Sequence, residues 1–191
     1  MQTDEQTVIE AVLKGKTQQY TMLLSRYGNE VMAFVGRMIH NREDAEELTQ
    51  DTFVRAFAQL RSYRREVAPF GCWIRRIAYR ETLMYLRRCK LPVISLDDSE
   101  HPLLLADSMW ADNVAEDGCE GGRVGLLEKA IRQLAPADQQ LLHLYYNDNR
   151  PLRDIAYIVE REPAYLATRL QRIRKKLFQM IKKAEQHEQQ R

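Results

Sequence analysis

The stretch that decides the fold is a pair of segments, EDAEELTQDTFVRAF at residues 43–57 and PFGCWIRRIAYRETLMYLRR at residues 69–88. Both carry apolar residues at the three- and four-residue spacing that is typical of an amphipathic helix. The outward face of the first segment is acidic, and that of the second is basic with interleaved aromatic rings. Opposite charges on two neighbouring helices favour two different partners, a basic protein surface and the phosphate backbone of DNA.

Helical spacing also covers most of the remaining chain. Gly15 and Gly28 are expected to interrupt or end helices within residues 5–40, and Asn41 is a good N-cap for a helix that reaches about residue 60. Further helices are expected at residues 126–134, from residue 136 to about 146, and after residue 149. Because no stretch shows the alternation of a strand, the sequence predicts an all-α fold class.

Charge divides the 191 residues into three blocks. Residues 1–90 hold 15 basic and 11 acidic side chains, residues 91–125 hold 1 and 8, and residues 126–191 hold 13 and 8. The middle block loses helical spacing and gathers Pro, Ser, Asp and Gly, as linkers do. The sequence therefore predicts two small helical domains, 1–90 and 126–191, joined by a flexible acidic linker at 91–125.

Several functional classes lack their sequence signals. Cys72, Cys89 and Cys119 form no paired motif, which fits a reducing compartment, and the four histidines are too scattered to suggest a metal site. The chain has no phosphate-binding loop and no nucleophile elbow, so neither enzymatic activity nor a cofactor is expected. No apolar run approaches the roughly 18 residues of a membrane span, and we expect a cytoplasmic protein.

The acidic segment carries apolar area inside its polar face. A helical wheel at ~100° per residue puts a core face on one side, formed by Ala45, Leu48, Thr49, Thr52, Phe53, Ala56, Phe57 and Leu60. The opposite face holds Glu43, Glu47, Gln50, Asp51, Val54 and Ala58. An ordinary solvated surface is one interpretation. Because Val54 and Ala58 give the face an apolar centre with a charged rim, a docking surface is the other.

This segment resembles the core-binding helix of bacterial sigma-70 family sigma factors, in the extracytoplasmic-function (ECF) group. The matching residues are Asp44, Ala45, Glu47, Leu48, Gln50, Asp51 and Phe53. The resemblance implies docking on the clamp region of the RNA polymerase β′ subunit. Together with the apolar centre, it makes the expected polymerase-binding residues Asp44, Glu47, Leu48, Gln50, Asp51 and Val54.

The basic segment and the loop before it suggest a nucleic-acid surface. Its expected core face is Phe70, Trp73, Ile74, Ile77, Met84 and Tyr85. Its expected outer face is Arg75, Arg76, Tyr79, Thr82, Leu83 and Leu86, flanked by Arg80 and Arg87. Arginines neutralise phosphates and a tyrosine offers a stacking platform, although a plain soluble basic face remains the alternative. The loop at residues 61–65 is also basic and aromatic, as a pocket for an unstacked base requires.

The same region resembles the part of the family that melts and reads the promoter −10 element, through the pattern Phe-x-x-Trp-Ile-x-x-Ile-Ala that begins at Phe70. The family commonly has Asn at the position of Arg80 and often Asp at that of Met84. The residues expected to bind −10 DNA are Tyr63, Arg64, Arg75, Arg76, Tyr79, Arg80 and Arg87.

Residues 152–177 read as a helix-turn-helix. A short apolar face (Leu152, Ile155, Ala156 and Val159) precedes a turn at residues 160–162, and a second helix begins at Pro163. In such motifs the start of the second helix reads base edges and later basic residues hold phosphates, while an ordinary basic helix is the alternative. The residues expected to bind DNA are Tyr165, Thr168, Arg169, Gln171, Arg172, Lys175 and Lys176.

This motif resembles the family's −35-binding domain, region 4. Asp154-Ile155-Ala156 stands where the family has Glu-Ile-Ala, and Thr168-Arg169-Leu170 stands where it has Ser-Arg-Leu. A lysine common in the family is Ala167 here, and the glycine common in the turn is absent. The two domains are accordingly expected to be a region 2-like helical bundle and a region 4-like helix-turn-helix.

The resulting hypothesis is an alternative sigma factor that binds core RNA polymerase and directs promoter-specific transcription initiation. The acidic linker suits the polymerase's basic channel, and the resemblance also implies control by an anti-sigma factor. The alternative function is a stand-alone helix-turn-helix transcriptional regulator with an N-terminal helical interaction module. A helical adaptor that binds no nucleic acid fits less well, because the second helix of the motif is basic.

Overall fold

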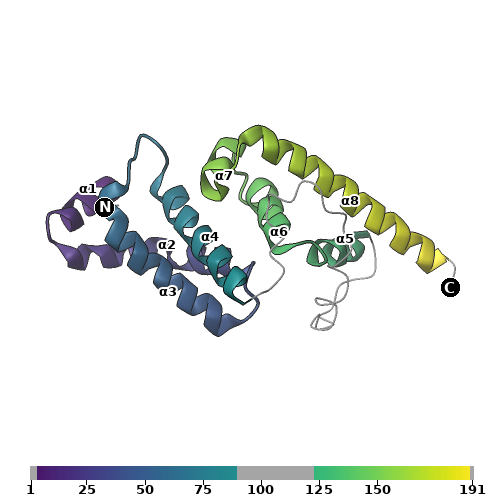
Figure 1. Ribbon diagram of the computed structural model, residues 1–191, viewed down its shortest axis with the longest axis horizontal. Helices are drawn as coiled ribbons and strands as arrows, with labels where there is room; N and C mark the ends of the chain where they lie inside the picture. Colours follow the sequence, from purple (N-terminus) through teal and green to yellow (C-terminus); the bar gives the residue numbers. More distant parts are fainter. Residues whose placement is uncertain (1–3, 90–122, 190–191) are drawn as a thin grey trace.

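Helices make up the part of the chain that the computed structural model describes, residues 4–89 and 123–189 (Figure 1). The N-terminal helices are α1 (Glu5–Leu13), α2 (Tyr20–Gly36), α3 (Arg42–Gln59) and α4 (Phe70–Arg88), with short 3₁₀ turns η1 (Thr17–Gln19) and η2 (Leu60–Ser62). The C-terminal helices are α5 (Arg123–Arg132), α6 (Pro136–Leu142), α7 (Leu152–Val159) and α8 (Pro163–Gln189), with a π-helical turn, η4 (His143–Asn147), after α6. These ranges contain no strand, and the expected all-α class is confirmed.

Local signals set several of the helix ends. The Asn41 side chain accepts hydrogen bonds from the backbone N–H groups of Glu43 (2.8 Å) and Asp44 (3.3 Å), which makes it the expected N-cap of α3. Gly15 follows α1 with a φ of +95°, a conformation that glycine adopts without strain. The expectation that Gly28 interrupts or ends a helix is wrong. It lies inside α2, whose turns on either side of it pack into the core.

The N-terminal helices form a bundle in which α2, α3 and α4 all pack on one another and α1 covers the start of α2. Phe34, Phe70 and Ile74 lie at its centre and are fully buried. Helices α2 and α4 approach closely at Gly71, where a Cβ atom would lie 3.1 Å from the Tyr27 ring. The bundle therefore holds the acidic helix and the basic helix side by side in fixed register.

The C-terminal helices form a second, smaller core. Helix α8 packs along α5 and crosses α6 and α7, and Leu144, Ile155, Ile158 and Leu166 are fully buried between them. Helix α5 begins at Arg123, inside the stretch assigned to the linker. The rest of that proposed linker, residues 91–122, lies outside the described residues, so the division into domains and linker stays a prediction.

The two cores meet where α7 lies against α4 (Figure 1). No sequence pattern predicted this contact, which joins residues more than 80 positions apart, such as Arg76 and Glu160. Glu160 ends α7 in the left-handed region, with a φ of 56°. The basic helix α4 is therefore covered on two sides, by the N-terminal bundle and by α7.

One ion pair ties α8 to α6. The Arg169 guanidinium donates two hydrogen bonds to the Asp138 carboxylate, at 2.8 and 2.9 Å, and both side chains are largely buried. Removing one partner of such a pair leaves the other charge buried without a counterion.

We expect Arg169→Ala to lower the free energy of unfolding by about 2–3 kcal/mol, the range for losing charge-assisted hydrogen bonds to a buried carboxylate. Arg172→Ala, three residues further along the same helix but exposed, is the matched control and is expected to change it by less than about 0.5 kcal/mol. Urea denaturation followed by far-UV circular dichroism measures both. Equal stability of the two variants would show that the pair does not hold α6 and α8 together.

Candidate functional site

The outward face of α3 is an exposed acidic surface with an apolar centre. We define it as the α3 acidic face, formed by Glu43, Glu46, Glu47, Gln50, Asp51, Val54 and Ala58, all exposed. Val54 is 67% exposed, a large fraction for a branched apolar side chain within a charged rim. Helices α2 and α4 both pack on the other side of α3, so the acidic face is open along the length of the helix.

Two of the expected polymerase-binding residues do not belong to this face. Leu48 is only 7% exposed and lies in the core, so we exclude it from the surface. Asp44 is half-buried, and its carboxylate accepts a 2.6 Å hydrogen bond from the Tyr85 hydroxyl, which raises the pKa of Tyr85. Asp44 thus links α3 to α4, and the four remaining residues of the set are exposed.

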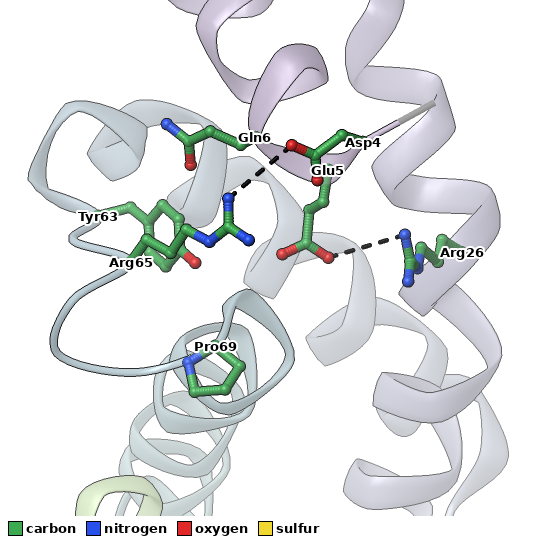
Figure 2. Close-up of a pocket in the computed structure, with 7 residues that line it drawn as sticks. All are labelled: Asp4, Glu5, Gln6, Arg26, Tyr63, Arg65 and Pro69. Atoms are coloured by element: carbon green, nitrogen blue, oxygen red, sulfur yellow. Dashed lines mark ion pairs between the residues drawn. The ribbon is translucent and has the colours of Figure 1, made fainter. Parts of the chain in front are cut away.

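The loop before α4 borders a surface pocket of about 530 Å³ (Figure 2). Its lining residues are Asp4, Glu5, Gln6, Arg26, Tyr63, Arg65 and Pro69. Figure 2 shows Arg65 reaching toward Asp4, with atoms 3.8 Å apart, and Glu5 facing Arg26 at 4.0 Å. The charges around the pocket are therefore paired across it, acid against base.

Tyr63 is held in place by neighbouring rings. It packs edge-on against Phe70 and tilted against Trp73, with ring centroids 5.4 and 5.5 Å apart, and is 8% exposed. Burial raises the pKa of its hydroxyl to about 12. The Arg64 side chain is exposed, but it donates to the backbone carbonyls of Arg61 (2.8 Å) and Tyr63 (3.0 Å). In this conformation Tyr63 offers no free ring face for a base, and Arg64 braces the loop.

The expected outer face of α4 is largely covered, because helices pack on both of its sides. Arg75 is 6% exposed, forms a 2.7 Å ion pair with Glu30 of α2, and donates to the Gly71 carbonyl at 3.2 Å. Tyr79 is 3% exposed, and burial raises the pKa of its hydroxyl to about 12. Thr82 and Leu86 are buried as well, whereas Met84, expected in the core, is 41% exposed. Arg75 and Tyr79 are therefore not on an open surface.

The other three arginines expected to bind −10 DNA are at least partly accessible. Arg87 is exposed near the end of α4. Arg76 is half-buried, and its guanidinium lies 4.8 Å from the centre of the Tyr157 ring of α7. Arg76 and Arg80 both form ion pairs with Glu160, at the end of α7. Burial alone would lower the pKa of Arg76, but its hydrogen bonds to Glu160 and Tyr157 outweigh that effect and raise it.

In the C-terminal half, α7 and α8 form the expected helix-turn-helix. The start of α8 exposes Thr168, Gln171, Arg172 and Lys175 on one face, and Tyr165 and Lys176 are half-buried beside it. The Thr168 hydroxyl donates back to the Ala164 carbonyl at 3.1 Å. Arg169 faces Asp138 instead of this surface, because its guanidinium is held by both carboxylate oxygens and its side chain is only 17% exposed.

The sequence did not single out Glu160, the residue that joins the basic helix to the helix-turn-helix. The one sequence feature that could have pointed to it is the absence of the glycine that the family commonly has in this turn. Cys72, at the same contact, has its Sγ 3.7 Å from Asp154 and 3.9 Å from Arg150. Cys72 is fully buried, and burial raises the pKa of its thiol.

Within residues 4–89 and 123–189, no group of three or more His, Cys, Asp or Glu side chains is placed to hold a metal ion. Among these same residues, no helix is long and apolar enough to cross a membrane.

Comparison with known proteins identifies the N-terminal bundle. A family model for sigma-70 region 2 matches residues 23–90. The ECF RNA polymerase sigma-E factor of Haemophilus influenzae is 33% identical over 85 residues, 44% of either chain. The RNA polymerase sigma-H factor of Pseudomonas aeruginosa is 27% identical over 77 residues, 40% of this chain and 39% of that one. The matched segment spans less than half the length of these relatives.

Two solved structures share the fold across most of the chain. The sigma factor RpoE from Bartonella quintana, in complex with the anti-sigma factor NepR, gives a TM-score of 0.61 at 20% identity and covers 86% of this chain and 98% of that one. CnrH, in complex with the cytosolic domain of CnrY, gives 0.60 at 16% identity and covers 92% and 96%. Residues 23–90 thus match region 2 of the sigma-70 family, and the chain shares its overall fold with these two sigma factors.

Proposed function

We propose that the protein is an alternative sigma factor, which binds core RNA polymerase and directs it to particular promoters. The observation that carries this proposal is the open α3 acidic face within the region 2 match, on the same chain as a helix-turn-helix with an exposed polar and basic face. A protein with both surfaces links a protein partner to DNA. Its role is non-enzymatic, and its place of action is the cytoplasm, where the polymerase works.

The polymerase contact is proposed for Glu47, Gln50, Asp51 and Val54. The three polar side chains lie on the same face of α3 as Val54, within two turns on its N-terminal side, and all four are exposed. An apolar centre excludes water while the acidic rim pairs with basic side chains, so contact and orientation come from one surface. The proposed partner surface is the clamp region of β′.

The promoter contacts are divided between the two halves. For the −10 element we propose Arg64, Arg76, Arg80 and Arg87, the arginines with accessible side chains, and we leave out Arg75 because Glu30 neutralises it inside the bundle. For the −35 element we propose Tyr165, Thr168, Gln171, Arg172, Lys175 and Lys176. Residues at the start of α8 are placed for base edges, and Lys175 and Lys176 for phosphates.

Control by an anti-sigma factor is also proposed. The likeness to sigma factors solved in complex with NepR or with the cytosolic domain of CnrY supports it, as does an exposed surface able to be covered by a partner. The alternative, a stand-alone regulator, is not favoured, because it gives the α3 acidic face no partner.

Purified core RNA polymerase with this protein is expected to produce promoter-dependent transcripts from genomic fragments that core polymerase alone leaves silent. Run-off transcription with and without the protein, followed by mapping of the 5′ ends, measures this. Shared −10 and −35 sequences upstream of the mapped starts are expected. Absence of any start that depends on the protein, with polymerase that responds to another sigma factor, would refute the proposed function.

Asp51→Arg is expected to weaken core polymerase binding at least tenfold, because it sets a like charge against the basic partner surface, and tenfold corresponds to about 1.4 kcal/mol. Stability should be nearly unchanged, since the side chain is exposed. Fluorescence titration with core polymerase measures the affinity. Glu10→Arg, an equal charge reversal on the exposed face of α1, is the control. Equal affinities for the two variants would place the contact elsewhere.

A further inference from the structure

Glu160 occupies a backbone position that costs free energy for its side chain. It ends α7 with a φ of 56° and a ψ of 46°, the left-handed conformation. A glycine adopts this conformation freely, whereas a residue with a Cβ atom crowds its own carbonyl. An acidic residue at such a position suggests that its carboxylate makes an interaction that offsets this cost.

That carboxylate binds two arginines of the other half of the protein. Its Oε1 atom accepts hydrogen bonds from both Nε, at 2.8 Å, and Nη2 of Arg76. Its Oε2 atom lies 3.3 Å from Nε of Arg80. Both oxygens of one anion thus engage two arginines on successive turns of α4, an arrangement that a nucleic-acid phosphate also offers to arginines.

The surrounding contact extends beyond this carboxylate. The Arg76 guanidinium lies over the Tyr157 ring of α7, and Arg37, directly after α2, donates a 3.2 Å hydrogen bond to Gln140 of α6. Tyr79, one turn from Arg76 on α4, is buried. The contact therefore uses two arginines proposed to bind −10 DNA, and the tyrosine that the sequence placed beside them is not accessible either.

We propose that Glu160 is an internal phosphate mimic, which holds α7 against α4 and competes with promoter −10 DNA for Arg76 and Arg80. The first half of this inference concerns the free protein alone, and the second half rests on the proposed function. One carboxylate and one DNA phosphate cannot occupy the same guanidinium edges, so DNA binds only when α7 has moved away. The apparent affinity for DNA is then lowered by the fraction of molecules that are closed.

The chemistry of the contact suits a reversible clamp. The Glu160 and Arg76 side chains are about one-third exposed, and that of Arg80 is 59% exposed, so water and salt reach the pairs. Partly exposed ion pairs contribute modestly and are screened by salt. A polyanion that offers many phosphates displaces a single carboxylate from such a site.

The test compares the full chain with Glu160→Gly, Glu160→Gln and the control Glu162→Gln, which changes an exposed acid in the same turn. The glycine variant removes the charge and the backbone cost together, so α7 still ends normally. The glutamine variant keeps the left-handed side chain and removes only the charge. Far-UV circular dichroism is expected to show all variants folded.

Small-angle X-ray scattering of the free protein tests, without any DNA, whether Glu160 holds α7 against α4. We call this contact the Glu160 clamp. Both Glu160 variants are expected to have a larger radius of gyration than the unmodified protein, while Glu162→Gln is unchanged. Unmodified protein at high salt is expected to expand in the same way. If neither Glu160 variant expands, the clamp is overturned, whatever the protein does in transcription.

Binding of a fluorescein-labelled single-stranded thymidine oligonucleotide, measured by anisotropy, tests whether Glu160 and DNA compete for Arg76 and Arg80. Both Glu160 variants are expected to bind it on the order of five- to tenfold more tightly than the unmodified protein at equal salt. The gain should vanish when Arg76 and Arg80 are both replaced by Gln in the Glu160→Gly background. Expansion without tighter binding, or a gain that survives loss of both arginines, would overturn the competition. Promoter-dependent transcription by the unmodified protein remains the separate test of the proposed function.

Discussion

The structure depends on α4 being packed from two sides. Phe70 and Ile74 anchor it in the N-terminal bundle, and Gly71 lets it approach α2 closely. On its other side α4 packs against α7, where Arg76 lies over the Tyr157 ring. A 19-residue helix with this much contact keeps its neighbours in register, so the acidic face of α3 and the helix-turn-helix are both oriented by it.

Carboxylates decide which of the many arginines remain available. Glu30 forms an ion pair with Arg75 in the N-terminal bundle, and Asp138 forms one with Arg169 between α6 and α8. Glu160 forms a third with Arg76, between the two halves of the chain. The first two pairs involve largely buried guanidinium groups, where loss of the partner leaves an unpaired charge. The third is partly exposed and open to competition by an external anion. Arg75 and Arg169 thus hold helices together, whereas Arg76 can exchange its carboxylate partner for an external anion.

The α3 acidic face contrasts with α4 in being free of such ties. Asp44, which lies beside this face and not on it, accepts a hydrogen bond from Tyr85 of α4. Val54 therefore presents its apolar surface to water without a covering element in the described part of the chain. Such a surface gains free energy when a partner removes it from water, which is the physical basis of the proposed polymerase contact.

The sequence by itself determined the helical class, the α3 helix with its Asn41 cap and exposed acidic face, and the helix-turn-helix that starts α8 at Pro163, because caps and helical spacing are local signals. The sequence placed Leu48 on the core face, where it lies, but it missed that the outer side of α4 is covered, since a helical wheel assumes one buried face and one exposed face. Only the tertiary structure decided which arginines are free. Their partners lie 31, 45 and 84 residues away, and ion pairs over such separations depend on how the helices pack and not on local spacing.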